Sequence, residues 1–196
     1  MNKAAIQQHI GKQVQLQEQE WEIFFAHFEY RSLARNELLC VAGDELVHFV
    51  LVESGCLMTY FTDREGHIHV MQFGTDMWWT GDLEAFTRGT GSRYSIKALM
   101  PSEVWLITRT GFEALVRRLP QLERYFRSLF QNALIAHQKR IIRNISYTAE
   151  EKYAEFIRTY PQVWQLVPQK YIASFMGITP EFLSKLRRQL LERERS

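Results

Sequence analysis

Hydrophobic and polar residues change their spacing twice along this chain. In residues 3–30 the apolar positions recur at helical intervals, which predicts a helix or helix pair with an aromatic side formed by Trp21, Ile23, Phe24, Phe25 and Phe28. From Arg31 to residue 108, short β-branched and aromatic segments alternate with glycine-containing turns. Helical spacing returns at Arg109. This order predicts an α+β protein.

The middle region is expected to form a β-roll, of the jelly-roll or sandwich kind. Its strands are expected at residues 48–54, 56–62, 67–73, 96–99 and 104–107, and Asp63 to Gly66 has the composition of a hairpin turn. Short strands without intervening helices are typical of such rolls. We therefore assign residues 1–108 to one domain.

Residues 109–145 are expected to form a linker and a long helix. Gly111 to Leu119 is a short amphipathic segment, Pro120 fits a first helical turn, and no Gly or Pro occurs from there to Ile145. One row follows a four-three alternation: Leu122, Phe126, Leu129, Ala133 and Ala136. A neighbouring row holds Phe130, Leu134, His137 and Ile141. The helix would be about 38 Å long. It could be a core helix of the monomer, but its apolar surface exceeds what the other helices can cover, which favours dimerisation.

Residues 146–196 are expected to form a helical domain. Thr148 and Glu151 make a capping box at the start of a helix that reaches about Tyr160. After a connector between Pro161 and Pro168, a helix from Gln169 to Met176 is followed by Gly177, which can adopt the left-handed conformation that ends a helix.

A second helix follows this turn. Thr179 suits its N-cap and Pro180 its first position. We expect one side to face the core (Phe182, Leu183, Leu186 and Leu190) and the other to be polar (Glu181, Ser184, Lys185 and Arg188). The pair has the pattern of a helix-turn-helix, whose second helix enters the major groove of DNA. An ordinary helical hairpin packed on a core has the same apolar pattern.

Composition narrows the function only slightly. The 196 residues are 46% hydrophobic and 13% aromatic, and the formal net charge is +2, so a nucleic-acid surface would have to be local. Cys40 and Cys56 are too few for a metal site made of cysteines alone. No segment has the apolar length of a signal peptide or a membrane span, so we expect a cytoplasmic protein without a membrane partner.

The order of β-roll, long helix and helix-turn-helix resembles the Crp/Fnr (catabolite activator protein) family of transcriptional regulators, especially the short Bacteroidetes-type forms. Gly43-Asp44, the segment from Phe49 to Gly55 and Gly81-Asp82-Leu83 resemble family motifs of the roll. The resemblance implies a cyclic-nucleotide-binding-like sensor and a homodimer. It also implies that double-stranded DNA, RNA polymerase and a small-molecule effector are partners, with no catalytic activity.

The sensor departs from the family pattern. In cyclic-nucleotide binders, the glycine-glutamate-leucine run holds the ribose and an arginine about ten residues later holds the cyclic phosphate. Here these positions carry Asp82 and Ser92, with Arg93 next to it. A serine cannot replace a charged, bidentate guanidinium. We therefore expect no cofactor, disfavour cyclic AMP, and assign an unknown effector to Gly81, Asp82, Leu83, Ser92, Arg93 and Tyr94.

In the second helix, alignment with the family places base-reading positions at Pro180, Glu181 and Lys185. Glu181 can accept a hydrogen bond from cytosine, and Lys185 can donate one to guanine. Ser184 allows close approach, and Arg188 shares this polar face. Gln169, Lys170 and Thr179 are expected at phosphates.

Two other classes of protein compete with this interpretation. His67 and His69 would point to the same side of a strand, as in metal-binding cupin enzymes, but residues 70–74 contain no carboxylate that could be a third ligand. The second competing class is a ligand-binding module that does not bind DNA.

Overall fold

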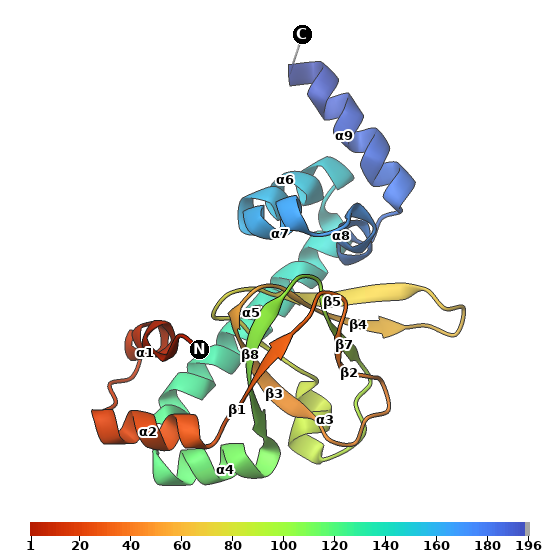
Figure 1. Ribbon diagram of the computed structural model, residues 1–196. Helices are drawn as coiled ribbons and strands as arrows, with labels where there is room; N and C mark the ends of the chain where they lie inside the picture. Colours follow the sequence, from red (N-terminus) through yellow and green to blue (C-terminus); the bar gives the residue numbers. More distant parts are fainter. Residues whose placement is uncertain (195–196) are drawn as a thin grey trace.

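The computed structural model describes residues 1–194, without the side chains of residues 191, 193 and 194. The chain begins with α1 (Lys3–Gly11) and α2 (Glu18–Ala26). The roll contains β1 (Glu29–Leu33), β2 (Leu38–Cys40), β3 (His48–Ser54), β4 (Leu57–Thr62), β5 (Ile68–Gly74), β6 (Trp79–Thr80), α3 (Leu83–Arg88), β7 (Ser95–Ala98) and β8 (Ser102–Thr108). The helices that follow are α4 (Arg109–Arg118), α5 (Leu122–Ser146), α6 (Ala149–Thr159), α7 (Pro161–Leu166), α8 (Gln169–Met176) and α9 (Pro180–Glu194), as Figure 1 shows.

Two antiparallel four-stranded sheets form the roll, in the orders β1-β8-β3-β6 and β2-β7-β4-β5. The predicted α+β class and β-roll are confirmed, and each of the five expected strands lies within two residues of an observed one. The helical assignment of residues 3–30 was wrong at its end, because α2 stops at Ala26 and Glu29 and Tyr30 pair with β8. The short elements β1, β2, β6 and α3 were not expected.

The central strands β3 and β8 are buried on both faces. Phe49 and Leu51 face a core formed with the helices, whereas Val50 and Val52 face the interior between the two sheets. This explains why the run from Phe49 to Val52 is continuously apolar instead of alternating.

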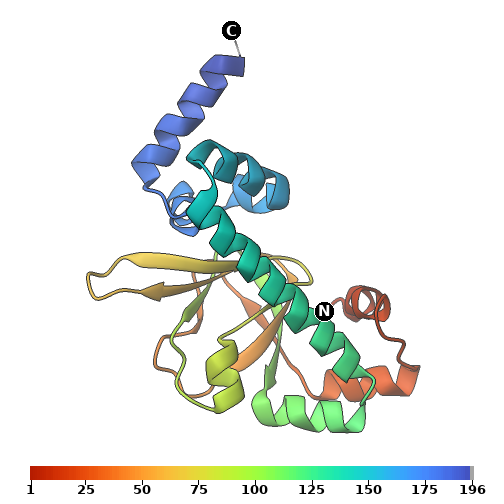
Figure 2. The ribbon, with the colours of Figure 1, turned by 180° about the vertical axis from the view of Figure 1, so that it is seen from behind.

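The helix α5 crosses the molecule from the roll to the C-terminal helices, as Figure 2 shows. In its first turns Leu122, Tyr125 and Phe126 are buried against the roll. Later in the same helix, large aliphatic side chains are exposed: Leu134, Ile135, Ile141, Ile142 and Ile145. The predicted long helix is therefore a core element only at its N-terminal end.

The C-terminal helices begin with the predicted capping box, in which Thr148 and Glu151 each bond the other's backbone amide. The expected connector after it is instead the short helix α7, with Pro161 at its first position. A third hydrophobic core joins these helices to the roll and contains Phe73, Leu99, Phe156, Val163 and Met176. Among the described residues, no helix is long and apolar enough to span a membrane.

Candidate DNA-binding and effector sites

The turn between α8 and α9 has the predicted geometry. Gly177 has φ 69°, and its amide donates to the carbonyl groups of the last turn of α8. Thr179 Oγ1 accepts a hydrogen bond from the Phe182 amide at 3.2 Å, as an N-cap does. Leu183 and Leu186 are buried, which fixes the rotation of α9 about its own axis.

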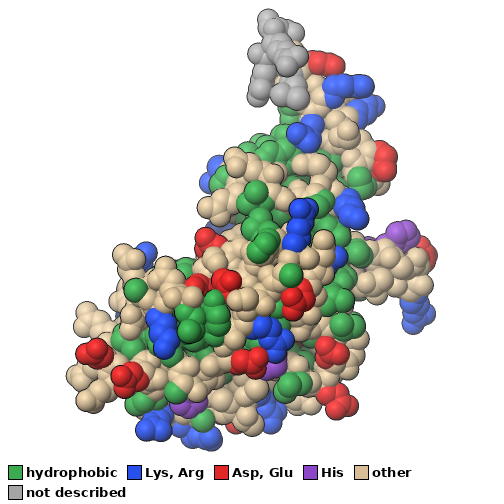
Figure 3. Space-filling model, in the orientation of Figure 1, with side chains coloured by type: hydrophobic (Ala, Val, Ile, Leu, Met, Phe, Trp, Pro, Cys, Tyr) green, Lys and Arg blue, Asp and Glu red, His purple; other side chains and the backbone are tan. Residues whose placement is uncertain are grey.

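The helix α9 projects from the body of the molecule, and in Figure 3 Lys and Arg side chains gather along it. Pro180, Glu181, Ser184, Lys185 and Arg188 are all exposed. Phe182 was expected on the core face, and this was wrong because its side chain is 48% exposed. Leu183 and Leu186 occupy the core positions, and Phe182, one residue before Leu183, is rotated by about 100° from it.

The residues expected at phosphates differ in their surroundings. Thr179 and Lys170 are exposed, and the Lys170 ammonium lies 5.0 Å from the centre of the Tyr171 ring. Gln169 begins α8, and its Oε1 is the one buried side-chain oxygen or nitrogen in the described residues that has no hydrogen-bond partner. Buried polar atoms normally have a partner.

The helix α8 is attached to the edge of the roll. Ser174 Oγ donates to the Ile68 carbonyl at 2.8 Å and accepts from the Val70 amide at 3.0 Å. From α5, Arg140 donates to the carbonyl groups of Met71, Val70 (2.8 Å) and Phe175 (3.4 Å), and its guanidinium lies 4.2 Å from the centre of the Phe175 ring. Arg140 thus connects the roll, the long helix and the helix-turn-helix.

Sequence reasoning missed Arg140, although the chain contains a sign of it. The row of α5 with the four-three alternation, extended in the same way, continues from Leu129, Ala133 and Ala136 to Arg140 and Arg143. Two arginines at positions that face the body of the protein indicate a polar contact there. Ser174 has no comparable signal, because serine is common on exposed helix positions.

The segments that carry the predicted effector residues, 81–83 and 92–94, are called here the Asp82 cassette, and their polar groups bond one another. Gly81, at φ 149°, passes so near β3 that a Cβ atom would lie 3.0 Å from the His48 carbonyl oxygen. Asp82 is 1% exposed and caps α3, because its Oδ1 accepts from the Ala85 amide at 3.0 Å. Its Oδ2 accepts from the Arg93 amide at 2.8 Å and from the Ser92 hydroxyl at 3.4 Å.

The other cassette residues leave no charged group inside. Ser92 is buried, and its hydroxyl donates to the Tyr94 carbonyl at 2.8 Å. The Arg93 side chain is 74% exposed and pairs with Glu84 at 3.4 Å on the surface. No guanidinium therefore lies beside Asp82 and Ser92 in the described residues.

A separate cavity of about 340 Å³ lies between the roll, α5 and the helix-turn-helix. Of the six predicted effector residues, Gly81 and Leu83 line it, whereas Asp82, Ser92, Arg93 and Tyr94 do not. Its walls include Trp78 and Trp79 from the roll, Ala133 and His137 from α5, and Phe175 from α8.

His67 precedes β5 and only His69 lies within it, in the exposed hairpin with β4, so the expected pair of histidines on one strand was wrong. His69 Nε2 lies 2.7 Å from Asp63 Oδ2, and this contact contributes most to lowering the pKa of Asp63 to about 2. Within the described residues, no group of three or more His, Cys, Asp or Glu side chains is arranged to hold a metal ion. From β5, His69 contacts the turn residue Asp63.

The fold and these sites define a class: a cyclic-nucleotide-binding-type roll joined by a long helix to a helix-turn-helix. Residues 30–119 match the cyclic nucleotide-binding domain family. Among curated relatives, the fumarate and nitrate reduction regulatory protein of Vibrio cholerae is 25% identical over 169 residues. That alignment covers 80% of this chain and 66% of the relative, slightly less than two thirds of its length.

Solved structures agree in fold. The global regulator CLP of Xanthomonas campestris aligns with a TM-score of 0.73 and 13% identity, over 91% of this chain and 93% of that one. The catabolite activator protein of Thermus thermophilus aligns with a TM-score of 0.57 and 18% identity, over 91% and 85%. The resemblance of this chain to the Crp/Fnr family of transcriptional regulators is therefore confirmed.

Proposed function

We propose that this chain is a homodimeric, sequence-specific DNA-binding transcriptional regulator of the Crp/Fnr type. Residues 1–108 form its sensor, 109–145 its linker and dimerisation helix, and 146–196 its DNA-binding domain. The observation that carries the proposal is α9, which is anchored by Leu183 and Leu186 and leaves Glu181, Lys185 and Arg188 exposed. Named regulators among the relatives support it.

The reading surface consists of the exposed side chains in the first turns of α9. Glu181 accepts from a cytosine amino group and Lys185 donates to guanine, while Ser184 and Pro180 allow the helix to approach the base edges. Phe182 adds an apolar group that suits a thymine methyl. Gln169, Lys170, Thr179 and Arg188 bind phosphates and set the register.

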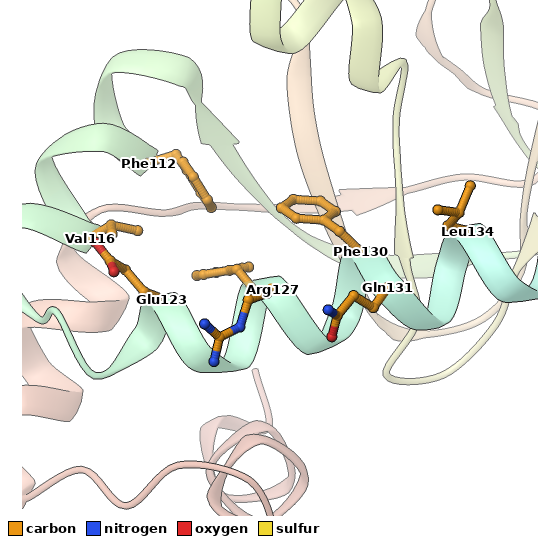
Figure 4. Close-up of a pocket in the computed structure, with 8 residues that line it drawn as sticks. Phe112, Val116, Glu123, Arg127, Phe130, Gln131 and Leu134 are labelled. Carbon is orange, nitrogen blue, oxygen red and sulfur yellow. The ribbon is translucent and has the colours of Figure 1, made fainter.

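The second copy of the chain would pack along α5. Leu134, Ile141 and Ile145 are 60%, 58% and 81% exposed and recur at heptad spacing, as at the seam of a coiled coil. A groove of about 490 Å³ beside them continues the apolar surface to α4. In Figure 4, Phe112 and Phe130 approach each other in this groove, whereas Arg127 extends away from it. A two-fold axis along α5 would place two recognition helices about one turn of DNA, 34 Å, apart.

Selection of bound duplexes from a random pool tests the DNA-binding function. We expect an enriched inverted repeat. Lys185→Ala and Glu181→Ala should each change the preference at one position of each half-site, by about 1–3 kcal/mol. Arg188→Ala should weaken binding to all sequences and reduce its salt dependence.

Lys139→Ala, on the exposed surface of α5, is the matched control and should leave both properties unchanged. A pool without enrichment, from protein shown to be folded and dimeric, would count against the proposal. Transcription from an enriched site, with purified RNA polymerase and with or without the chain, tests RNA polymerase as a partner.

A further inference from the structure

The cavity between the roll and α5 has a wide apolar portion. Trp78, Trp79, Phe49, Met77 and Phe130 line it. On the side of α5, between Leu129 and Arg140, the lining includes the small side chains of Ala133 and Ala136, which leave space unfilled. A volume of about 340 Å³ is sufficient for a small organic molecule.

The other end of the cavity is cationic. Arg140 and Arg143 line it from α5, and the described residues contribute no Asp or Glu to its wall. Arg143 has a carboxylate partner outside the wall, Glu155, at 3.5 Å. The hydrogen bonds of Arg140 go to main-chain carbonyl groups, so the charge of its guanidinium is not neutralised by them.

Tyr160 provides a further polar group at this end. Burial raises the pKa of its phenol, which therefore remains a hydrogen-bond donor at neutral pH. Arg140 is half-buried, and a cation removed from water with only neutral partners keeps part of its desolvation cost. An anion would form a stronger, charge-assisted and bidentate pair with the guanidinium than the carbonyl groups do.

We propose that the effector of this regulator is an arylalkanoate, a monocarboxylate with an aromatic body, bound in this cavity with its carboxylate at Arg140 and its ring between Trp78 and Phe130. The inference deepens the proposed function, and its regulatory part depends on it. The site differs from the Asp82 cassette, whose polar groups already bond one another.

Binding would also change the attachment of the helix-turn-helix. Arg140 holds the Phe175 carbonyl of α8 and the Val70 and Met71 carbonyls of β5 through the same guanidinium. A carboxylate that takes over these donors weakens the contact between α8 and the roll. The effector would therefore alter the position of the recognition helix from within one subunit.

Thermal unfolding and isothermal titration of the full chain test the ligand class. The probes are phenylacetate, 4-phenylbutanoate and indole-3-acetate, each beside its primary amide, with cyclic AMP as a further comparison. At a hundredfold excess over Kd, at least one carboxylate should raise Tm by about 5 °C, and its amide should bind at least tenfold more weakly. Equal binding of acid and amide, binding of cyclic AMP alone, or binding of none of these probes would overturn the proposal.

Variants then place the site. Ala133→Phe fills the cavity from an exposed helix position and should abolish carboxylate binding with little change in the Tm of the free protein. Arg140→Met should remove the preference for acid over amide. Lys139→Phe, on the same helix outside the cavity wall, is the control and should bind normally.

Unchanged carboxylate affinity in Ala133→Phe and Arg140→Met would place the ligand elsewhere and overturn the proposal. Selection of DNA by the ligand-free protein is scored separately. If no carboxylate binds but DNA is still selected, the effector site is contradicted and the proposed function stands. If a carboxylate binds but no DNA is selected, the proposed function and the regulatory role of the ligand are contradicted, and the ligand site stands.

Discussion

The two ends of α5 are built in opposite ways. At the N-terminal end Leu122, Tyr125 and Phe126 are at most 3% exposed, and the Tyr125 hydroxyl accepts a 2.8 Å hydrogen bond from the Trp79 indole. At the C-terminal end Arg140 holds carbonyl groups next to a cavity, while Ile141 and Ile142 are 58% exposed.

The difference separates a permanent contact from one that can be exchanged. Dry aromatic packing has no alternative partner of equal quality, so the first end stays with the roll. Hydrogen bonds to carbonyl groups can be exchanged for hydrogen bonds to a ligand. Exposed aliphatic side chains can be covered by a second chain. One helix therefore joins the roll, to which it is fixed, to C-terminal helices whose attachment can change.

The largest expected effect comes from the buried end. Leu122→Ala should lower the free energy of unfolding by about 2–5 kcal/mol, because Leu122 is fully buried and the cavity left behind cannot collapse completely. Urea unfolding measures this. Leu134→Ala, the same change at a 60% exposed position, should act mainly through dimer dissociation and so depend on protein concentration. Equal losses of unfolding free energy in the two variants, independent of protein concentration, would contradict the difference between the two ends of α5.

A charge at the exposed end should separate the subunits. Ile141→Asp places like charges near each other across the proposed two-fold axis, which costs several kcal/mol. We expect dimer dissociation to be favoured on the order of a hundredfold or more in sedimentation equilibrium, while the circular dichroism spectrum stays native. Loss of the folded spectrum would instead mean that Ile141 belongs to the monomer core.

The attachment of α8 should be weaker than either core. Ser174→Ala removes the partner of the Val70 amide and of the Ile68 carbonyl, and should cost about 1–3 kcal/mol. Its matched control is Ser184→Ala on the exposed face of α9, expected within about 0.5 kcal/mol of the parent chain. Both are measured by urea unfolding. A Ser174→Ala protein as stable as the control would show that the hydrogen bonds of Ser174 add nothing to the attachment of α8.

The smallest effect compares two thiols. Cys40 lies in the core of the roll, and Cys56 lies in the core shared with the C-terminal helices. Burial raises the pKa of both thiols, that of Cys56 to about 12. At pH 8 neither should react with a disulfide reagent in the native protein. Ser174→Ala should speed the reaction of Cys56 and not that of Cys40.

The raised pKa of Cys56 predicts the direction in which the free energy of unfolding changes with pH. Because the folded state keeps the Cys56 proton, stability should fall as the pH rises above about 8.5, the ordinary pKa of an unfolded thiol. Substitution of Cys56 by alanine should flatten this part of the stability curve. An unchanged curve in the Cys56→Ala protein would assign the loss to other groups.

Local patterns were sufficient to predict much of this fold. The helix from Gln169 to Met176, the left-handed Gly177 and the capping box at Thr148 each depend on a few neighbouring residues, and all are present. The short elements β1, β2, β6 and α3 were missed because two to six residues carry too little periodicity.

Contacts between distant segments could not be predicted in the same way. Ser174 lies more than a hundred positions from Ile68, and nothing in either segment marks the pairing. The cassette shows the same limit, since the sequence places Ser92 ten residues after Asp82 but not their mutual hydrogen bond. Phe182 was assigned to the wrong face because it is next to Leu183, and the apolar pattern alone does not show on which side of Leu183 the buried stripe lies.

The position of Ser174 and Arg140 has a further consequence for solubility. β5 is the last strand of its sheet, and its free edge would offer unpaired amide and carbonyl groups to another strand. Ser174 covers the Ile68 carbonyl and the Val70 amide, and Arg140 covers the carbonyl groups of Val70 and Met71. Helices α8 and α5 thus also protect the chain from aggregation at this edge, and any movement that separates α8 from the roll must keep the edge covered.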